Sequence, residues 1–362
     1  MSDATLTLNP SAMTPKPQPK QPSENRQDLT ETCHPMPGGF DCGNGSVKLA
    51  LDIHEVRCPS YILPIHADIY DPPTSDQGGL VAYIDGDRTD LKGSRWLAGH
   101  PAYQQNPESY FRVVDDPQGK ITYGLHLLLG CLATLPYQAQ MILNLVASIH
   151  LQKAFGDQLQ AVLQGKHVVE FNACGKQTTI TVNILKTLEE GAGAIVQCRS
   201  EIDPEKQTLV YDFGNGTCII SVFGSKGRLV DREVRPGGVE NLINAIAKNI
   251  DLVRQLSQEG DRQIVRAGIE TGSFRYGETG WSFEEIYRSE LKPWIVAVLK
   301  TALKAGSKWR PTCSHSIAIG GGSQLPLISE LLTQQGIVPV KDGAWANARG
   351  LRRFAVLLGG GR

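Results

Sequence analysis

Apolar residues recur along the chain in patterns that predict strands and helices in two successive blocks. In the first block we expect a buried helix at Tyr123–Leu135, because its apolar residues cover every helical face, and a second helix at Lys153–Leu163. The predicted strands of this block are Ser46–Ile53, Tyr61–Ile69, Gly79–Ile84, Gln140–His150, His167–Phe171 and Thr178–Ile184, the last two paired across a turn at 174–176.

The second block begins after Gln207 and again alternates between strands and helices. We expect strands at Thr208–Phe213, Ser316–Ile319 and Ile337–Val340, a hairpin through Ser225–Gly227, and helices at Gly238–Gln255, Phe283–Leu303, Leu325–Gln334 and Trp345–Leu358. The helix at Phe283–Leu303 has a sustained apolar stripe, an expected N-cap at Ser282 and an expected kink at Pro293. Strands mixed with helices in both blocks indicate an α/β fold.

Residues 1–38 have a different composition, with seven of the 21 prolines and no apolar periodicity. Such a segment buries too little apolar surface to offset its ordering entropy, so we expect it to be disordered or extended. An inert tail is favoured over a flexible docking arm.

Composition and charge narrow the class of protein. Lysine and arginine number 36 against 37 acidic residues, a balance that argues against a dedicated DNA-binding surface. No apolar run is long enough for a membrane-spanning helix, and the first residues do not resemble a signal peptide. The eight cysteines are scattered without a Cys-x-x-Cys pair, as expected for small buried residues. A soluble, cytoplasmic protein is therefore expected.

The most informative feature is an internal repeat. Residues 41–46 read Asp-Cys-Gly-Asn-Gly-Ser, residues 212–217 read Asp-Phe-Gly-Asn-Gly-Thr, and each copy runs into a β-type segment. Asn-Gly between two extended segments is a strong hairpin signal, so turn chemistry would explain a single copy. Two copies, one in each block, suggest two hairpins that face each other across a cleft.

Such hairpins are suited to phosphate binding, because glycines permit positive φ and close approach of backbone N–H groups to an anion. The candidate residues for nucleotide contact are Gly43, Asn44, Gly45, Gly214, Asn215, Gly216 and Thr217. Asp41 and Asp212 are placed to hold Mg²⁺, through its water ligands. Lys48 either neutralises the phosphates or is a solvated strand residue.

Gly320, Gly321 and Gly322 lie between a strand and an expected helix with its N-cap at Ser323, which suits either an anion or a plain tight connection.

These motifs resemble the ATPase superfamily of actin, heat-shock chaperones and sugar kinases, and within it the plasmid-segregation actins of the ParM/StbA type. The resemblance covers about residues 39–358 and extends to residues 85–99, 143–150, 188–194 and 347–351. It implies an actin-like ATPase fold with two RNase H-like lobes around a nucleotide cleft. The expected organisation is a tail at 1–38, a first lobe at 39–187 and a second lobe at 188–362, whose last helix packs back on the first lobe.

The resemblance also implies roles for individual residues. Glu190, in the stretch Leu-Glu-Glu-Gly-Ala-Gly-Ala, would position the water that attacks the γ-phosphate, and Glu189 is the alternative. Together with Asp41 and Asp212, Glu190 completes the predicted catalytic set. Gly237 and Gly238 are candidates for phosphate or ribose contact, or else form a simple helix-starting turn.

The implied function is a filament-forming protein that binds and hydrolyses Mg-ATP, with GTP as the alternative nucleotide. Its expected partners are further copies of itself and an adaptor protein bound to plasmid DNA, without direct nucleic-acid or membrane binding. A small-molecule kinase, a cell-shape or divisome actin, and a scaffold without turnover remain as alternatives.

Overall fold

The computed structural model describes residues 34–116 and 118–359, and their strands form two sheets. The first sheet has the order β3-β2-β1-β8-β10-β9-β5-β6-β4-β7 and the second the order β13-β12-β11-β14-β15. The strands of the first sheet are β1 (Met36–Cys42), β2 (Ser46–Leu51), β3 (His54–Pro59), β4 (Tyr61–Pro64), β5 (Gly78–Gly86), β6 (Arg95–Gly99), β7 (Phe111–Arg112), β8 (Gln140–Ile149), β9 (Gly165–Phe171) and β10 (Gln177–Glu189). Those of the second are β11 (Thr208–Phe213), β12 (Thr217–Phe223), β13 (Leu229–Pro236), β14 (His315–Ile319) and β15 (Val338–Pro339).

Five strands of the first sheet, in the order β3-β2-β1-β8-β10, repeat the topology of the second sheet. In the first, β1, β2 and β3 form an antiparallel meander, and β1 is parallel to β8, which is parallel to β10. In the second, β11, β12 and β13 form the same meander, and β11 is parallel to β14, which is parallel to β15. The strand pairs β1–β2 and β11–β12 are the two repeated hairpins, so the sequence repeat corresponds to a repeat of the fold.

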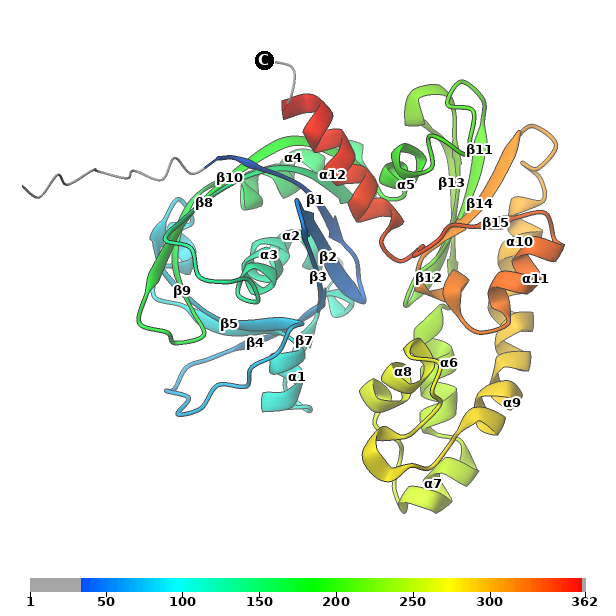
Figure 1. Ribbon diagram of the computed structural model, residues 1–362, viewed down its shortest axis with the longest axis horizontal. Coiled ribbons are helices and arrows are strands. Elements are labelled where there is room, and N and C mark those ends of the chain that lie inside the picture. The colour runs from blue at the N-terminus through cyan, green and yellow to red at the C-terminus, as the bar shows by residue number, and fades with distance from the viewer. Residues whose placement is uncertain (1–33, 117, 360–362) are drawn as a thin grey trace, which may run out of the picture. The chain divides into compact units, whose positions relative to one another are not determined.

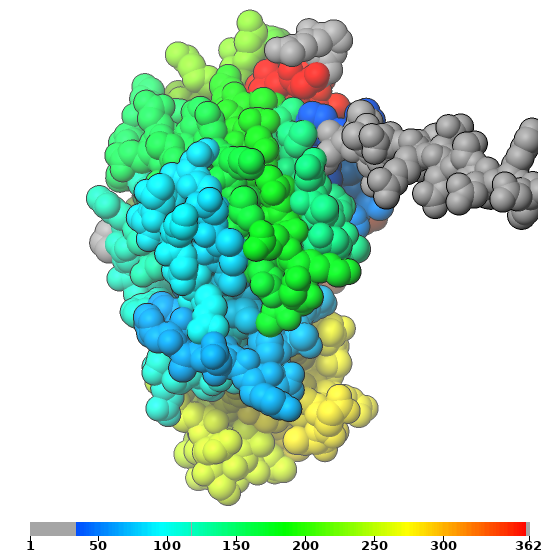
Figure 2. All heavy atoms as spheres, turned by 90° about the vertical axis from the view of Figure 1, so that its left-hand side faces the viewer, coloured from blue at the N-terminus to red at the C-terminus, as the bar shows by residue number. Residues whose placement is uncertain are grey.

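The first sheet curves around a buried helix, α3 (Gly124–Leu132), which contacts β2 to β6 (Figure 1). Its sequence, Gly-Leu-His-Leu-Leu-Leu-Gly-Cys-Leu, is apolar on nearly every face, as a helix surrounded by a sheet requires. The other helices that follow strands of this sheet are α1 (His100–Gln105), α2 (Gly119–Thr122), α4 (Gln152–Leu163) and α5 (Ala192–Gln197). Figure 2 shows the face on which the segments of β5 and β8 to β10, coloured cyan to green, are exposed.

The helices of the second block form a separate apolar core with the second sheet. They are α6 (Val239–Ala247), α7 (Ile250–Leu256), α8 (Arg262–Glu270), α9 (Glu284–Trp294), α10 (Lys300–Gly306) and α11 (Ile328–Gln334), with a π-helical turn at Ile295–Leu299. Short 3-10 turns lie at Thr89–Leu91, Val113–Asp115, Ser225–Gly227, Gly277–Thr279 and Gly321–Gln324.

The last helix, α12 (Ala346–Gly359), crosses β1 and α5 at very short range (Figure 1). A Cβ added at Gly39 would lie 2.1 Å from the carbonyl oxygen of Ala348, and one added at Gly350 would lie 1.7 Å from that of Gly193. Glycine at these positions is therefore what allows α12 to join the end of the chain to the first sheet. Among the described helices, none is long and apolar enough to cross a membrane.

Most of the predicted elements are confirmed, including the buried helix, the pairing of β9 with β10 and the hairpin into β13. The expected helix at Gly238–Gln255 is wrong in extent, because α6 ends at Ala247 with Lys248 at its C-cap. Asn249 then caps the next helix by accepting a hydrogen bond from the Asp251 N–H at 3.0 Å. The strand β3 has no counterpart among the predicted elements, and the predicted strand Tyr61–Ile69 ends at Pro64.

The details of the long helix also differ from the expectation. It begins at Glu284, with Phe283 rather than Ser282 at its N-cap, and the π-helical turn follows Pro293, which cannot donate a backbone hydrogen bond. At the N-terminus, β1 begins at Met36, inside the predicted tail, and residues 1–33 of that tail lie outside the described residues.

Candidate active site

A cavity of about 550 Å³ lies between the two sheets, and both repeated hairpins line it. Of the residues selected from the sequence, it is lined by Asp41, Gly43, Asn44, Gly45, Lys48, Glu190, Asp212, Gly214, Asn215, Gly216, Thr217, Gly320 and Gly321. Residues far apart in the chain are thus brought together around one space large enough for a small ligand.

The tips of the two hairpins touch. A Cβ added at Gly45 would lie 2.4 Å from the Cβ of Asn215, so any side chain at this position would force the hairpins apart. The expectation of positive φ is wrong here, since Gly43, Gly45, Gly214 and Gly216 all lie outside that region of backbone conformation. Their contribution is the close approach of the two turns. The Gly43 N–H donates to the Asp41 carbonyl at 3.1 Å and the Gly214 N–H to the Thr217 carbonyl at 3.0 Å, so these two donors are used within the hairpins and a ligand would be met by the glycines at the tips, Gly45 and Gly216.

Asp41 is held in a network at the end of β1. Its Oδ1 accepts hydrogen bonds from the Asn347 side-chain N–H at 2.9 Å and from the Ser148 hydroxyl at 3.1 Å. Asn347 lies on α12 and its Oδ1 accepts the Gly193 N–H at 3.0 Å, so one side chain ties α5, α12 and β1 together. Lys48 Nζ lies 3.9 Å from Asp41 Oδ2, which places its charge inside the cavity.

Asp212 occupies the equivalent position at the end of β11. Burial raises its pKa to about 7, and the negative charges of Asp41 and Glu190 add to this effect while Lys48 and Lys120 oppose it. Keeping several buried carboxylates ionised close together costs free energy, and a bound cation would lower that cost.

The neighbouring glutamates Glu189 and Glu190 have different environments. Glu189 accepts the backbone N–H of Gln152 at 3.0 Å and forms an ion pair with Arg232 at 2.8 Å, so its carboxylate is used within the protein. Glu190 lines the cavity and pairs with Lys120, while its carbonyl accepts a hydrogen bond from Arg232 at 2.7 Å.

A third glycine segment lies against the second hairpin. Gly320 has φ +81°, and a Cβ there would lie 2.5 Å from Asp212 Oδ1, so both its conformation and its contacts require glycine. The predicted N-cap at Ser323 is wrong, because Gly321–Gln324 form a 3-10 turn and α11 begins only at Ile328. Gly322 packs on Phe213 and does not line the cavity.

Gly237 and Gly238 also lie outside the cavity lining. The Gly237 N–H donates to the Gly216 carbonyl at 3.1 Å, and a Cβ at Gly238 would lie 2.4 Å from the Asn215 carbonyl oxygen. These two glycines support the second hairpin from behind.

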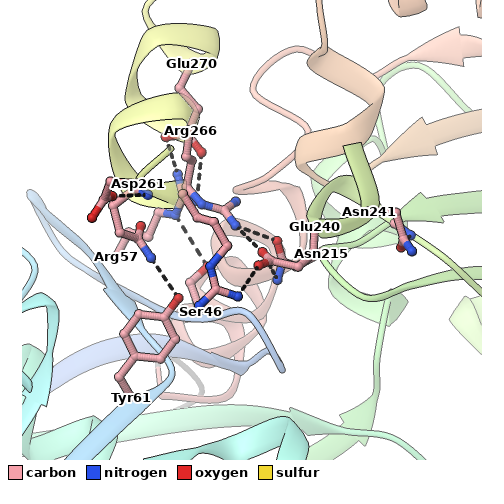
Figure 3. Close-up of polar contacts among 12 residues, drawn as sticks. Ser46, Arg57, Tyr61, Asn215, Glu240, Asn241, Asp261, Arg266 and Glu270 are labelled. Carbon is pink, nitrogen blue, oxygen red and sulfur yellow. Dashed lines mark hydrogen bonds and ion pairs between the residues drawn. The ribbon is translucent and has the colours of Figure 1, made fainter. Parts of the chain in front are cut away.

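One wall of the cavity is a polar bridge from α8 to the first sheet, which no sequence motif indicates (Figure 3). Arg57 on β3 donates two hydrogen bonds of 3.0 Å to the Glu270 carboxylate, and the Gln263 side chain donates to the Tyr61 hydroxyl at 2.8 Å. Tyr103 donates to Asp261, the residue that caps α8. Because the bridge joins α8 to the first sheet, it closes the cavity on one side.

The same helix holds the tip of the second hairpin (Figure 3). Arg266 donates to the Asn215 Oδ1 at 2.9 Å and to Glu240 at 2.7 Å. Asn215 is therefore fixed by α8 on one side and contacts Gly45 on the other, so the hairpins and the bridge form one connected structure.

Comparison with known proteins agrees with this architecture. Residues 39–193 match the family model of the N-terminal domain of actin-like proteins. ParM from Bacillus thuringiensis, solved with AMPPNP, superposes with a TM-score of 0.66 at 21% identity, covering 89% of this chain and 99% of that one. The fold is actin-like.

Two further structures are similar to the chain. An archaeal actin homologue superposes with a TM-score of 0.66 at 15% identity, covering 88% of this chain and 98% of that one. The filament of a ParM from Clostridium botulinum gives a TM-score of 0.65 at 16% identity, covering 90% and 99%. A comparison with curated protein sequences finds no significant match. The expected resemblance to ParM-type actins and the expected fold are confirmed.

The residues of the cavity fit a magnesium ion that is held together with a nucleotide. No group of three His, Cys, Asp or Glu side chains in the described part of the chain is arranged as a metal site. Mg²⁺ commonly uses one or two carboxylates and takes its other ligands from phosphates and water. Asp41 and Asp212 supply two carboxylates to one cavity. The pKa of Asp212 is raised first by burial and then by the negative charges of Asp41 and Glu190, and a cation bound beside these carboxylates would offset both effects.

Several residues of the candidate site were not selected from the sequence: Ser148, Asn347, Lys120, Arg57, Glu270 and Arg266. Ser148 and Asn347 lie in the segments 143–150 and 347–351, to which the resemblance extends without giving either residue a role, and the other four lie in segments without a glycine hairpin or a motif of their own. Their positions depend on contacts between distant segments. Spacing along the chain therefore carries no signal for them.

Proposed function

We propose that this chain is an ATPase that binds Mg-ATP in the cavity between its sheets and assembles into filaments. One observation carries the proposal: two glycine hairpins, equivalent in sequence and topology, meet at their tips, and the aspartate of each lines the same cavity. Backbone N–H groups at the tips of two opposed turns are suited to an anion such as a polyphosphate. The likeness to ParM structures solved with ATP and with AMPPNP supports the choice of nucleotide.

In the proposed complex, the two hairpins hold the β- and γ-phosphates, and Lys48 neutralises part of their charge. Asp41 and Asp212 would hold Mg²⁺, which would neutralise charge on the phosphates. Glu190 orients the attacking water and accepts its proton. We assign this role to Glu190 rather than Glu189, because the Glu189 carboxylate is already bound by Arg232 and the Gln152 N–H.

The biological role we propose is plasmid segregation through filaments that reach DNA by way of an adaptor protein. Its support is the likeness to ParM proteins, one of them solved as a filament, together with the near-neutral charge of this chain. Direct binding to duplex DNA is not expected, and a filter-binding assay with plasmid DNA would detect it.

The test is to follow light scattering and phosphate release together after adding Mg-ATP to the purified protein. Scattering that rises first, followed by phosphate release, is the expected result, and AMPPNP should support assembly without release. Asp212→Ala should abolish both signals, whereas Asp157→Ala, an exposed aspartate on α4, should leave both unchanged.

Other outcomes would contradict the proposal. Flat scattering at high protein concentration with transfer of phosphate to a small acceptor would favour a kinase. Assembly on lipid vesicles alone would favour a cell-shape or divisome actin. Absence of nucleotide binding would remove the ATPase assignment altogether.

A further inference from the structure

Lys120 is a buried cation at the cavity that no sequence motif marks. It lies in α2, a single helical turn between β7 and α3, and its ammonium forms an ion pair with Glu190 Oε1. The Lys120 side chain is 5% exposed and that of Glu190 11% exposed, and both residues line the cavity. The pair therefore lies at the wall of the proposed nucleotide site, away from bulk solvent.

The backbone of Lys120 is fixed close to the strand that carries Asp41. A Cβ added at Gly119 would lie 2.2 Å from the Val113 carbonyl oxygen, so this turn packs directly on the preceding segment. The Cys42 thiol, next in sequence to Asp41, lies 3.9 Å from the Lys120 carbonyl oxygen. These contacts hold the lysine in place from behind and direct its long side chain toward Glu190.

Glu190 is fixed from the opposite side. Its carbonyl accepts the 2.7 Å hydrogen bond from Arg232, and Gly191, with φ +85°, begins the turn into α5. One carboxylate oxygen, Oε1, is bound to Lys120, and the described residues make no hydrogen bond to the other, Oε2. The pair thus leaves one oxygen of the carboxylate available to a ligand in the cavity.

The charges around the pair favour its ionised form. Burial by itself would raise the pKa of Glu190, but Lys120 outweighs this and the pKa is lowered, with His150 and Arg232 acting in the same direction. Burial would lower the pKa of Lys120, but Glu190, together with Cys42 and Asp41, outweighs it and the pKa is raised. The other charged groups that face this region are Asp41 on β1, Asp212 on β11 and Lys48 on β2.

We propose that Lys120 is a positioning residue for hydrolysis, which holds the Glu190 carboxylate in the orientation that presents Oε2 to the attacking water. This inference rests on the proposed function. In the hydrolytic step, the water oxygen bonds to the γ-phosphorus and the bond from that phosphorus to the β–γ bridging oxygen breaks. The electron pair of the broken bond leaves with ADP, and Oε2 takes the proton that the water loses.

The test compares Lys120→Met, Lys120→Arg, Glu190→Gln and the double variant Lys120→Met/Glu190→Gln in single-turnover hydrolysis from about pH 5 to 9. Lys120→Met should bind ATP within about threefold of the unmutated protein and hydrolyse it about 10- to 100-fold more slowly. The acid limb of its pH–rate profile should move to higher pH, because Glu190 loses the charge that keeps it ionised. Lys120→Arg should recover most of the rate.

The double variant guards against a misfolded single variant, because it leaves no unpaired charge buried in the wall. It should be no slower than Glu190→Gln alone, since both changes affect the same carboxylate. Lys48→Met is the matched control for Lys120→Met, because Lys48 also lines the cavity. It should weaken nucleotide binding, whereas Lys120→Met should slow hydrolysis.

Three results would overturn the inference in different ways. A Lys120→Met rate within about threefold of the unmutated rate, with an unchanged pH profile, would remove Lys120 from the reaction and leave the proposed function intact. A double variant much slower than Glu190→Gln would show that Lys120 acts independently of Glu190. Absence of hydrolysis by the unmutated protein would refute the proposed function, and this inference with it.

Discussion

Replacing Gly45 by alanine tests whether contact between the hairpin tips is needed to hold a nucleotide. In the structure, the added Cβ would lie 2.4 Å from Asn215 Cβ, 2.7 Å from its Cγ and 2.8 Å from its Nδ2. Ordinary van der Waals contact begins at 3.4 Å. To relieve the closest clash, of 2.4 Å, the two hairpin tips must therefore move apart by about 1 Å. Asn215 cannot move freely, because Arg266 and Glu240 hold its side chain.

The expected consequence is loss of nucleotide affinity and of hydrolysis. Two opposed turns can bind and position phosphates only if the distance between the turns is right. A misplacement of about 1 Å can slow the reaction as much as 100-fold. We therefore expect Gly45→Ala to weaken Mg-ATP binding and slow hydrolysis by about 10- to 100-fold. Isothermal titration with AMPPNP and single-turnover phosphate release would measure the two effects.

The controls separate this clash from a general effect of alanine in the turns. Gly216→Ala changes the other hairpin, where an added Cβ meets nothing within 4 Å, so the thermal stability of the nucleotide-free protein should not change. Adding Asn215→Gly to Gly45→Ala removes the side-chain atoms that clash and should recover part of the affinity. Binding by Gly45→Ala within about threefold of the unmutated protein would refute the reasoning.

Three further predictions concern the charged groups. Asp212→Ala should abolish measurable Mg-nucleotide binding in a titration, because it removes one of two proposed magnesium carboxylates, and unchanged affinity would contradict that assignment. Burial, together with Arg88, lowers the pKa of His126 to about 4, so between pH 4 and 6.5 the unfolded state binds a proton that the folded state does not, and stability falls as the pH drops through this range. His126→Phe should therefore be about 2 kcal/mol more stable to urea than the unmutated protein at pH 5 and nearly equal to it at pH 7, and equal differences at both pH values would exclude this cause. Arg57→Ala should cost at most about 1 kcal/mol in urea unfolding, because its ion pair with Glu270 is partly exposed, and the charge reversal Arg57→Glu/Glu270→Arg should recover that loss; a cost well above this would show that the bridge stabilises the whole fold.

The hairpins are predictable from the amino-acid sequence because their chemistry is local. Asn-Gly between two extended runs specifies a turn by itself, and the repetition of Asp-x-Gly-Asn-Gly at Asp41 and Asp212 is enough to relate the two turns to each other. The helix α3 is equally plain, since a segment that is apolar on all faces has to be buried.

Helix boundaries are predicted less well, for reasons that are visible at single residues. Helix α6 ends at Ala247 and Asn249 caps α7, although the apolar periodicity continues across this break. The residues after Gly320 are expected to enter a helix at once, but they form a 3-10 turn against Phe213 and Asp212. In both places a local capping or packing interaction outweighs the hydrophobic pattern.

Residues adjacent in the chain are enough to establish the α/β class, the two equivalent hairpins and the candidacy of the carboxylates Asp41 and Asp212. Each of these features is a short-range pattern, so it can be recognised without knowledge of how the chain packs. The candidacy of Glu190 comes instead from the resemblance to ParM-type actins.

The arrangement of these groups in space depends instead on tertiary packing. Packing brings the three carboxylates to one cavity, binds Glu189 to Arg232 and leaves Glu190 facing the cavity beside Lys120. It also closes one side of the cavity through α8. Ion pairs of this kind join residues that are tens to hundreds of positions apart. Their formation depends on how sheets and helices pack, and no spacing along the chain records it.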